Sequence, residues 1–307
     1  MAFGSCFVEN IGEKLSALKY SIDVNPYGIQ YNPSSIGQGL ERLLSGNHFK
    51  ETELFEYQGI WHSFYHHSDF SGRSRENCLL KINSRLESAA SNLLETNFLL
   101  LTLGTAWVFA LSDTDEVVNN CHKLPAVRFK RYRLSVDEVV EKMEISIQKL
   151  IAVNPNVKII MTVSPIRHLK DGFNENQLSK ATLLLACEKL SEKFPTLSYF
   201  PSYELMMDDL RDYRFYKSDL IHPNEQAIDY IWEKFETAFL DNSEAALRKD
   251  IEKLSIAAAH RVFNPQTAES RQFAQIQLQK IDALKKSQPS LNFETEEKWF
   301  NSLINIQ

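Results

Sequence analysis

The sequence predicts an α/β fold with a central parallel sheet, crossover helices on both of its faces, and a helical region after it. Two continuous apolar runs, Phe98 to Leu103 and Val157 to Val163, are typical of parallel strands buried on both faces. Helical segments alternate with such runs up to about residue 240, as in βαβ units. Residues 243–307 show helical spacing and no strand pattern. We therefore expect an α/β domain over residues 1–240 and a helical extension over residues 241–307.

The composition narrows the class of protein. The 307 residues are 43% hydrophobic and 24% charged, which is ordinary for a globular chain with a sizeable core. A net charge of -6 argues against nucleic acid as the main partner, and no apolar run is long enough to span a bilayer. The N-terminus lacks the pattern of a signal peptide. The widely spaced Cys6, Cys78, Cys121 and Cys187 are typical of reduced thiols, so we expect a cytoplasmic protein. We also expect no membrane partner and no cofactor.

The N-terminal segment predicts a strand, a tight turn and a helix. A short apolar start, Met1 to Phe3, leads into Gly4-Ser-Cys6, and apolar residues then recur at helical spacing to about Lys19. The strand is so short that we expect native residues to precede it. Ser5 and Cys6 are possible nucleophiles, placed where the free N–H groups of a helix can stabilise an oxyanion. Gly and Ser also mark ordinary turns, so this segment alone is weak evidence of catalysis.

The remaining elements follow from the same periodicities and from turn residues. We expect Ser34 or Ser35 to cap the first of the later helices and Gly46 to close it. The expected elements are helices over 34–45, 74–95, 135–153, 176–194, 202–211 and 224–239, hairpins over 52–66 and 108–118, and a short strand over 197–200.

Polar side chains follow the carboxyl ends of the expected strands, where open α/β sheets bind their ligands. They belong to Gly4-Ser-Cys6, Gly104-Thr-Ala106 and Ser164-Pro-Ile-Arg-His168. Asp219 and His222 stand three residues apart in the loop before the last helix of this domain. That spacing lets Asp219 orient an imidazole that activates a nucleophile. The alternative is an ordinary turn, capped by Asp219, with His222 on the surface.

Other histidines have simpler explanations beside the functional ones. His122 and His168 lie in polar clusters, where they contact substrate or make a structural hydrogen bond to the backbone. His62 and His66 stand four residues apart within an expected hairpin, without a convincing third ligand. We therefore expect no metal site.

Six motifs, spread in order over residues 1–240, resemble those of one known family. They are Gly4-Ser-Cys-Phe7, Asn25-Pro-Tyr-Gly28, Thr102-Leu-Gly-Thr-Ala-Trp107, Asn120-Cys-His-Lys123, Thr162-Val-Ser-Pro-Ile-Arg-His168 and Asp219-x-x-His222. Together they resemble the GSCFA-domain family, which is grouped with the SGNH/GDSL hydrolases. Val8 stands where that family usually has Ala, and the helical tail is outside the resemblance or only loosely covered. The resemblance implies a three-layer α/β/α sandwich (SGNH-hydrolase-like, flavodoxin-like) that hydrolyses or transfers acyl esters.

The superfamily pattern also implies roles for the two neighbouring nucleophiles. It places the nucleophile two residues after the first Gly, which is Cys6 here, and Ser5 then takes the place usually held by Asp. An Asp-x-x-His near the end supplies the base, here His222 oriented by Asp219. We favour Cys6, and the alternative is that Ser5 attacks while Cys6 is a small buried hydrophobe. A thioester on Cys6 favours acyl transfer, whereas Ser5 favours hydrolysis.

The oxyanion hole of the superfamily is matched only in part. Gly28 matches the Gly whose N–H contributes, but Ala106 stands where an Asn side chain is expected. Thr105, Asn32 or Asn120 could replace that donor. The candidate oxyanion and substrate-binding residues are Gly28, Asn32, Gly104, Thr105, Asn120, His122 and His168.

The sequence thus favours a hydrolase or acyltransferase that acts on a small-molecule or carbohydrate ester, such as an O-acylated carbohydrate. The rival is a non-catalytic carbohydrate- or partner-binding module that keeps the fold without the oxyanion Asn. The oligomeric state is open. For residues 243–307, a lid, a dimer surface and simple support of the fold all fit the apolar spacing.

Overall fold

The computed structural model describes residues 1–260 and 262–305. Within it the chain forms two compact units. The first comprises Met1–Gly12 and Ile22–Lys234, and the second comprises Glu13–Ser21 and the described part of Phe235–Gln307. The candidate site residues named above all belong to the first unit, so that unit positions the site.

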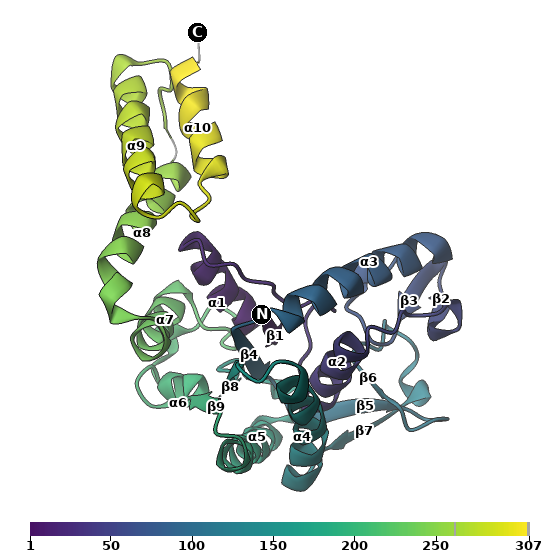
Figure 1. The fold of residues 1–307 in the computed structure, drawn as a ribbon. Helices are drawn as coiled ribbons and strands as arrows, with labels where there is room; N and C mark the ends of the chain where they lie inside the picture. Colours follow the sequence, from purple (N-terminus) through teal and green to yellow (C-terminus); the bar gives the residue numbers. More distant parts are fainter. Residues whose placement is uncertain (261, 306–307) are drawn as a thin grey trace. The chain divides into compact units, whose positions relative to one another are not determined.

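A parallel sheet of four strands is the centre of the first unit, in the order β1-β4-β8-β9 (Figure 1). Its strands follow the predicted apolar runs, and helices flank the sheet in a mixed α/β architecture that fits a three-layer sandwich. The predicted fold class is therefore confirmed. The four strands are β1 (Ala2–Gly4), β4 (Phe98–Leu103), β8 (Lys158–Val163) and β9 (Leu197–Phe200).

Strand β4 buries both of its faces, which explains why its sequence is apolar without alternation. Leu99, Leu101 and Leu103 pack into a hydrophobic core shared with helices α2 to α5. Leu100 points to the opposite face and is also buried. The helices that share the core are α2 (Pro33–Ser45), α3 (Arg75–Leu94), α4 (Val136–Val153) and α5 (Phe173–Lys193).

The other elements of this region begin or end close to the strand ends. The short helix α6 (Ser202–Met207) packs against β8, where the Thr162 and Ser202 hydroxyls lie 2.6 Å apart. Helix α6 ends before the predicted Arg211. Helices α1 (Cys6–Ala17) and α7 (Glu225–Phe239) each begin in the first unit and continue into the second.

Two smaller antiparallel sheets accompany the central sheet. The predicted hairpin over residues 52–66 is confirmed as β2 (Leu54–Tyr57) paired with β3 (Ile60–Ser63). The second hairpin is also confirmed, but it has a third strand that the sequence did not predict. That sheet has the order β6-β5-β7, with β5 (Trp107–Leu111), β6 (Val117–Val118) and β7 (Phe129–Arg133). The two aromatic residues of Phe-Lys-Arg-Tyr-Arg in β7 are three positions apart and so lie on opposite faces, each next to basic residues. The strand therefore has no apolar face that would reveal it in the sequence.

The N-cap of helix α2 lies two or three residues before the predicted serine cap. It is Asn32, whose Oδ1 accepts a hydrogen bond from the Ser35 N–H at 2.8 Å, and Pro33 fills the first helical position. Ser34 and Ser35 therefore lie inside the first turn. The predicted end of the helix at Gly46 is confirmed, with φ of 63°.

Short 3-10 helices join the larger elements: η1 (Glu51–Glu53), η2 (Ser68–Phe70), η3 (Ala126–Arg128), η4 (Leu169–Asp171), η5 (Tyr213–Phe215) and η6 (Asn242–Glu244).

The second unit is helical, as its sequence spacing predicts. Phe273 and Phe300 pack edge to face across two of its helices, and the Ser255 hydroxyl donates to the Ala17 carbonyl at 2.9 Å. No helix in the described part of the chain is long and apolar enough to cross a membrane. The helices after α7 are α8 (Ala245–Ala259), α9 (Ala268–Ser287) and α10 (Glu294–Asn305).

Candidate active site

The parallel register brings three polar segments to one edge of the central sheet. Gly4 of β1 stands opposite Thr102 of β4, and Thr102 stands opposite Thr162 of β8. The residues that follow these positions therefore leave the sheet side by side. This juxtaposition of Ser5, Gly104 and Ser164 is what the sequence predicted for the strand ends.

Gly4 makes the turn between β1 and α1 possible. Its φ is +144°, and a Cβ there would lie 2.2 Å from the Thr102 carbonyl oxygen. Any other residue would be strained by the backbone conformation and would also collide with the neighbouring strand. The turn consequently holds the two following residues, Ser5 and Cys6, in a fixed place at the sheet edge.

Ser5 and Cys6 have different surroundings although they are adjacent. Ser5 is 1% exposed, and its hydroxyl donates to the Ser164 hydroxyl at 2.9 Å and accepts from the Phe7 N–H at 3.4 Å. Cys6 is half-buried and opens helix α1, with its Sγ 3.8 Å from the Tyr31 hydroxyl oxygen. Helix α1 thus begins on a buried serine that caps it and a thiol that solvent can reach.

Asp219 and His222 form the predicted pair. His222 Nδ1 lies 2.7 Å from Asp219 Oδ2, while Asp219 Oδ1 accepts from the N–H groups of Ile221 and His222 at 2.9 and 3.0 Å. These hydrogen bonds, those of the backbone first, lower the pKa of Asp219 to about 2. The two side chains are 44% and 40% exposed. Asp219 is therefore a fixed carboxylate that orients the imidazole and leaves His222 Nε2 free of that contact.

The loop that carries the pair is tightly built for an exposed segment. Leu220 lies between the two residues with φ of 58°, a left-handed conformation that is unfavourable for leucine. The Leu220 N–H donates to the Lys217 carbonyl at 2.9 Å, and the Lys217 N–H donates to the His222 carbonyl at 2.8 Å. The loop backbone is therefore locally strained at Leu220, and the same loop keeps the Asp219 carboxylate in contact with the imidazole of His222.

His168 lies at the sheet edge, next to Gly104 and Tyr31. Its ring packs edge to face against Tyr31, with ring centroids 5.8 Å apart. Burial is the main cause that lowers the pKa of His168 to about 3, and the positive charges of Lys180 and His222 lower it further. His168 is therefore neutral at physiological pH, and its Nε2 is buried without a hydrogen-bond partner. A neutral imidazole in this place can accept or donate one hydrogen bond to a bound molecule.

Lys180 is a site residue that the sequence interpretation missed. It is 1% exposed, and its Nζ donates to the carbonyl oxygens of Gly104 and Ser164, both at 2.7 Å. It thereby ties the ends of β4 and β8 together. Burial lowers the pKa of Lys180 to about 7. The sequence did contain a signal, because Lys180 occupies the buried stripe of α5 between Asn176 and Leu183.

The predicted oxyanion donors already have partners within the protein. The Gly28 N–H donates to the Asn25 carbonyl at 2.8 Å. Both functional atoms of the Asn32 amide contact Ser35, because Asn32 caps helix α2. The N–H groups of Gly104 and Thr105 donate to the Tyr31 carbonyl, and the Thr105 hydroxyl lies 3.1 Å from that of Ser179.

Asn120 and His122 belong to a separate cluster around the β2–β3 hairpin. The Asn120 amide donates to the Ser68 hydroxyl at 3.4 Å, and its oxygen accepts from the His122 N–H. His122 is buried, and its Nε2 lies 2.8 Å from the Ser63 carbonyl oxygen, as in the structural alternative weighed for it. Its ring also lies against that of His62, and burial lowers the pKa of His122 to about 4. In the part of the chain that the structure describes, no group of three or more His, Cys, Asp or Glu residues could hold a metal ion.

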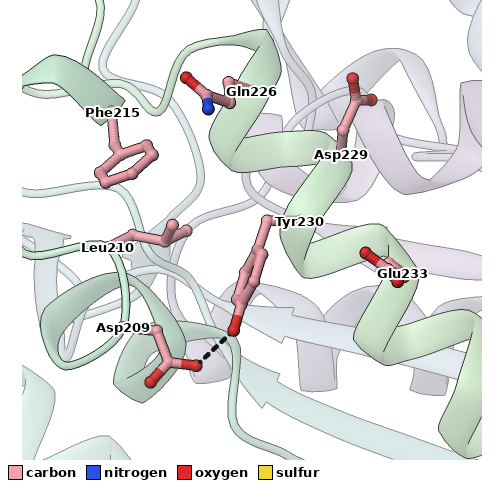
Figure 2. A pocket seen from close by; sticks show the side chains of 7 residues that line it. All are labelled: Asp209, Leu210, Phe215, Gln226, Asp229, Tyr230 and Glu233. Atoms are coloured by element: carbon pink, nitrogen blue, oxygen red, sulfur yellow. Dashed lines mark hydrogen bonds between the residues drawn. The ribbon is translucent and has the colours of Figure 1, made fainter.

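A hollow of about 390 Å³ lies near the start of helix α7 (Figure 2). In it the Tyr230 hydroxyl donates to Asp209 at 2.8 Å, and Phe215 faces the same space. None of the predicted site residues lines this hollow. Its lining is Asp209, Leu210, Phe215, Gln226, Asp229, Tyr230 and Glu233.

Fold and site together define an α/β protein of the parallel-sheet class, with a thiol at a strand–helix turn and an Asp–His pair in a later loop. The chain belongs to the GSCFA family, whose family model matches residues 1–235. Residues 251–306 match the model of the GSCFA domain protein C-terminal domain, so the tail also has a counterpart in this family. No curated protein and no solved structure shows significant similarity to the chain.

Proposed function

We propose that this protein is an SGNH-type hydrolase or acyltransferase that acts on acyl esters through a covalent acyl-enzyme. The observation that carries the proposal is the 2.7 Å contact between Asp219 and the half-exposed imidazole of His222. A carboxylate that holds Nδ1 leaves Nε2 to accept a proton from a nucleophile. The assignment to the SGNH/GDSL hydrolases rests on the resemblance of the sequence motifs.

Cys6 is the proposed nucleophile. It is the more accessible of the two candidates, and it opens helix α1, where N–H groups without partners in the helix can stabilise negative charge. The Ser5 hydroxyl is instead committed to Ser164 and to the Phe7 N–H. The alternative was that Cys6 is a small buried residue and Ser5 attacks. In the structure Ser5 is the more buried of the two residues.

The proposed reaction has two stages. His222 takes the thiol proton while Cys6 Sγ forms a bond to the ester carbonyl carbon, and the carbonyl π electrons move to the oxygen. The oxyanion then re-forms the carbonyl, the bond to the leaving oxygen breaks, and His222 returns its proton to that oxygen. The resulting thioester passes its acyl group to an alcohol or to water. Because thioesters react readily with alcohols, transfer to a hydroxylated small molecule, such as a carbohydrate, is the favoured outcome.

We also propose the cytoplasm as the compartment and a small-molecule or carbohydrate ester as the main partner, rather than nucleic acid or a membrane. Cys6, Cys78, Cys121 and Cys187 are all free thiols in the structure, which supports a reducing environment. The net charge of -6 supports the exclusion of nucleic acid.

The test compares Cys6→Ala, Ser5→Ala and His222→Ala with the wild type, using p-nitrophenyl acetate as substrate and mass spectrometry for the acetyl adduct. We expect Cys6→Ala and His222→Ala to lower turnover by about 1,000-fold or more, because each removes a member of the catalytic unit. Ser5→Ala should keep turnover within about threefold and still form the adduct. Loss of the adduct in Ser5→Ala alone would make Ser5 the nucleophile and favour hydrolysis. Absence of turnover and adduct in the wild type would favour the rival, a non-catalytic binding module.

A further inference from the structure

Tyr31 lies beside the proposed nucleophile although no sequence motif singled it out. Its hydroxyl oxygen is 3.8 Å from Cys6 Sγ, within hydrogen-bonding distance for sulfur. Its ring is half-buried and packs nearly perpendicular to the ring of His168. The hydroxyl thus contacts the thiol, while the ring that carries it packs against a neutral imidazole.

The end of strand β4 holds the backbone of Tyr31 in this place. Its carbonyl oxygen accepts hydrogen bonds from the N–H groups of Gly104 and Thr105 at 2.8 and 3.0 Å. A Cβ on Gly104 would lie 3.0 Å from that oxygen and 3.4 Å from the Tyr31 Cα, so glycine permits the close approach. Tyr31 is therefore part of the rigid strand-end framework, which is what a preorganised donor requires.

The other candidates for the missing oxyanion donor are engaged elsewhere. The Asn32 amide caps helix α2, the Thr105 hydroxyl bonds with Ser179, and the Asn120 amide donates to Ser68. By contrast, the Tyr31 hydroxyl points to the sulfur that would form the acyl-enzyme. An oxyanion on the carbon attached to that sulfur is two bonds away from it. A hydroxyl at this distance from sulfur can therefore reach the separation of about 2.7–3.1 Å that a stabilising donor needs.

The tyrosine also keeps its proton under ordinary conditions. Burial is the main cause that raises the pKa of Tyr31 well above its usual range, and the neighbouring Cys6 raises it further. The hydroxyl is therefore a neutral donor throughout the physiological pH range.

Resting on the function proposed above, we propose that Tyr31 is a further catalytic residue, whose hydroxyl donates a hydrogen bond to the oxyanion formed on the Cys6-bound acyl group. Sulfur forms its bond to the carbonyl carbon, and the π electron pair moves to the oxygen. The Tyr31 O–H stabilises that oxygen until the pair re-forms the carbonyl and the alkoxide leaves with the proton from His222. Tyrosine keeps its own proton throughout, so it replaces the amide N–H of the absent Asn.

Tyr31→Phe removes the donor and keeps the ring, so it is the variant that tests this role. With p-nitrophenyl acetate we expect kcat to fall about 100- to 1,000-fold with little change in KM, the usual loss for one oxyanion donor. The alkylation rate of Cys6 by iodoacetamide should stay within about twofold, because that reaction forms no oxyanion. Tyr27→Phe is the matched control. Tyr27 lies four residues before Tyr31, and its hydroxyl donates to the Gly39 carbonyl at 3.0 Å. Removal of the Tyr27 hydroxyl should leave kcat unchanged.

The outcomes separate this role from the alternatives. Unchanged kcat in Tyr31→Phe would overturn the proposal. An equal fall in kcat and in the alkylation rate would also overturn it, because Tyr31 would then act on the thiol itself. Failure of the proposed function looks different, since wild-type protein would then show no turnover, or Cys6→Ala would retain it. Thermal unfolding of both Tyr→Phe variants checks that any loss does not come from an unfolded fraction.

Discussion

Two regions of the candidate site are held in place in different ways. One is the set of buried hydroxyl and amine groups at the strand ends, and the other is the exposed loop of residues 217–223. Ser5, Ser164 and Lys180 are at most 1% exposed, and hydrogen bonds tie them to one another or to strands β4 and β8. Asp219 and His222 are roughly 40% exposed, and their hydrogen bonds stay within the loop. The hydrogen bonds of the buried group join segments that are distant in the sequence. Those of Asp219 and His222 join only residues of the same loop.

We infer from this difference that the buried group mainly stabilises the fold, whereas the exposed pair has little effect on stability. A buried hydroxyl that loses its partner carries a desolvation cost, so changes in the buried group should lower stability. An exposed ion pair contributes little to stability because water screens it. We therefore propose that the Asp219–His222 contact orients the imidazole rather than stabilises the fold. The following predictions test this contrast.

The largest effect is expected in the exposed loop, from Asp219→Asn. The amide oxygen can still accept from the Ile221 and His222 N–H groups, but it no longer presents a carboxylate to His222 Nδ1. We expect turnover of p-nitrophenyl acetate to fall about 100- to 10,000-fold through loss of the correct tautomer and of imidazolium stabilisation. Thermal unfolding should move by about 1 °C or less, because the pair is exposed.

Asp212→Asn is the matched control for that variant. Asp212 is an exposed carboxylate nearby in the chain, whose Oδ1 accepts from the Arg214 N–H at 2.9 Å, and it has no imidazole partner in this contact. Its turnover should equal that of the wild type. A similar loss of activity in both variants, or a large fall in stability for Asp219→Asn, would contradict the division between the two regions.

The sequence predicted most of the sheet and the Asp–His pair because both depend on local patterns. The apolar runs of β4 and β8 appear directly in the sequence, and the i, i+3 spacing of Asp219 and His222 lets one turn join them. The strand β7 lacked such a pattern, since its two aromatic residues lie on opposite faces among basic residues.

The surroundings of the adjacent nucleophile candidates could not be predicted in this way. Ser5 is buried, and its hydroxyl contacts Ser164, which is 159 residues away in the chain. Tyr31 lies beside Cys6, and its carbonyl is held by the N–H groups of Gly104 and Thr105, which follow β4. Such contacts depend on how segments distant in the sequence pack against each other, which cannot be deduced from the local patterns of a single sequence. Lys180 differs, because its place on the buried stripe of α5 was visible in the spacing.

An intermediate effect is expected in the buried region, from Lys180→Met. The variant leaves the Gly104 and Ser164 carbonyls without their side-chain donor, and we expect a loss of about 2–5 kcal/mol in the free energy of unfolding at pH 9. Urea denaturation measures it. Lys189→Met on the exposed side of the same helix, where Lys189 pairs with Asp137 at 2.8 Å, should cost about 0.5 kcal/mol or less.

The pH dependence of the same variant sharpens this test. Lys180 has a pKa of about 7 in the folded protein and 10.5 as its ordinary value, so the unfolded chain binds more protons between these values. Stability from this group is therefore complete above pH 10.5 and is lost as the pH falls through 7. We expect the stability difference between wild type and Lys180→Met to grow by roughly 2 kcal/mol from pH 7 to pH 9. A constant difference would show that Lys180 stays protonated in the fold.

The smallest effect is expected from the hydroxyl pair of Ser5 and Ser164. Ser164→Ala leaves the Ser5 O–H without its acceptor and the Ile166 N–H without its 3.3 Å contact, so we expect a loss of about 1–2 kcal/mol. The double variant Ser5→Ala/Ser164→Ala should lose less than the sum of the two single variants, by about 0.5–1.5 kcal/mol, because the second change removes no further hydrogen bond between them. Urea denaturation of all four proteins gives this coupling energy. Additive losses would mean that the 2.9 Å contact contributes nothing of its own, and Ser5 would then be held by burial alone.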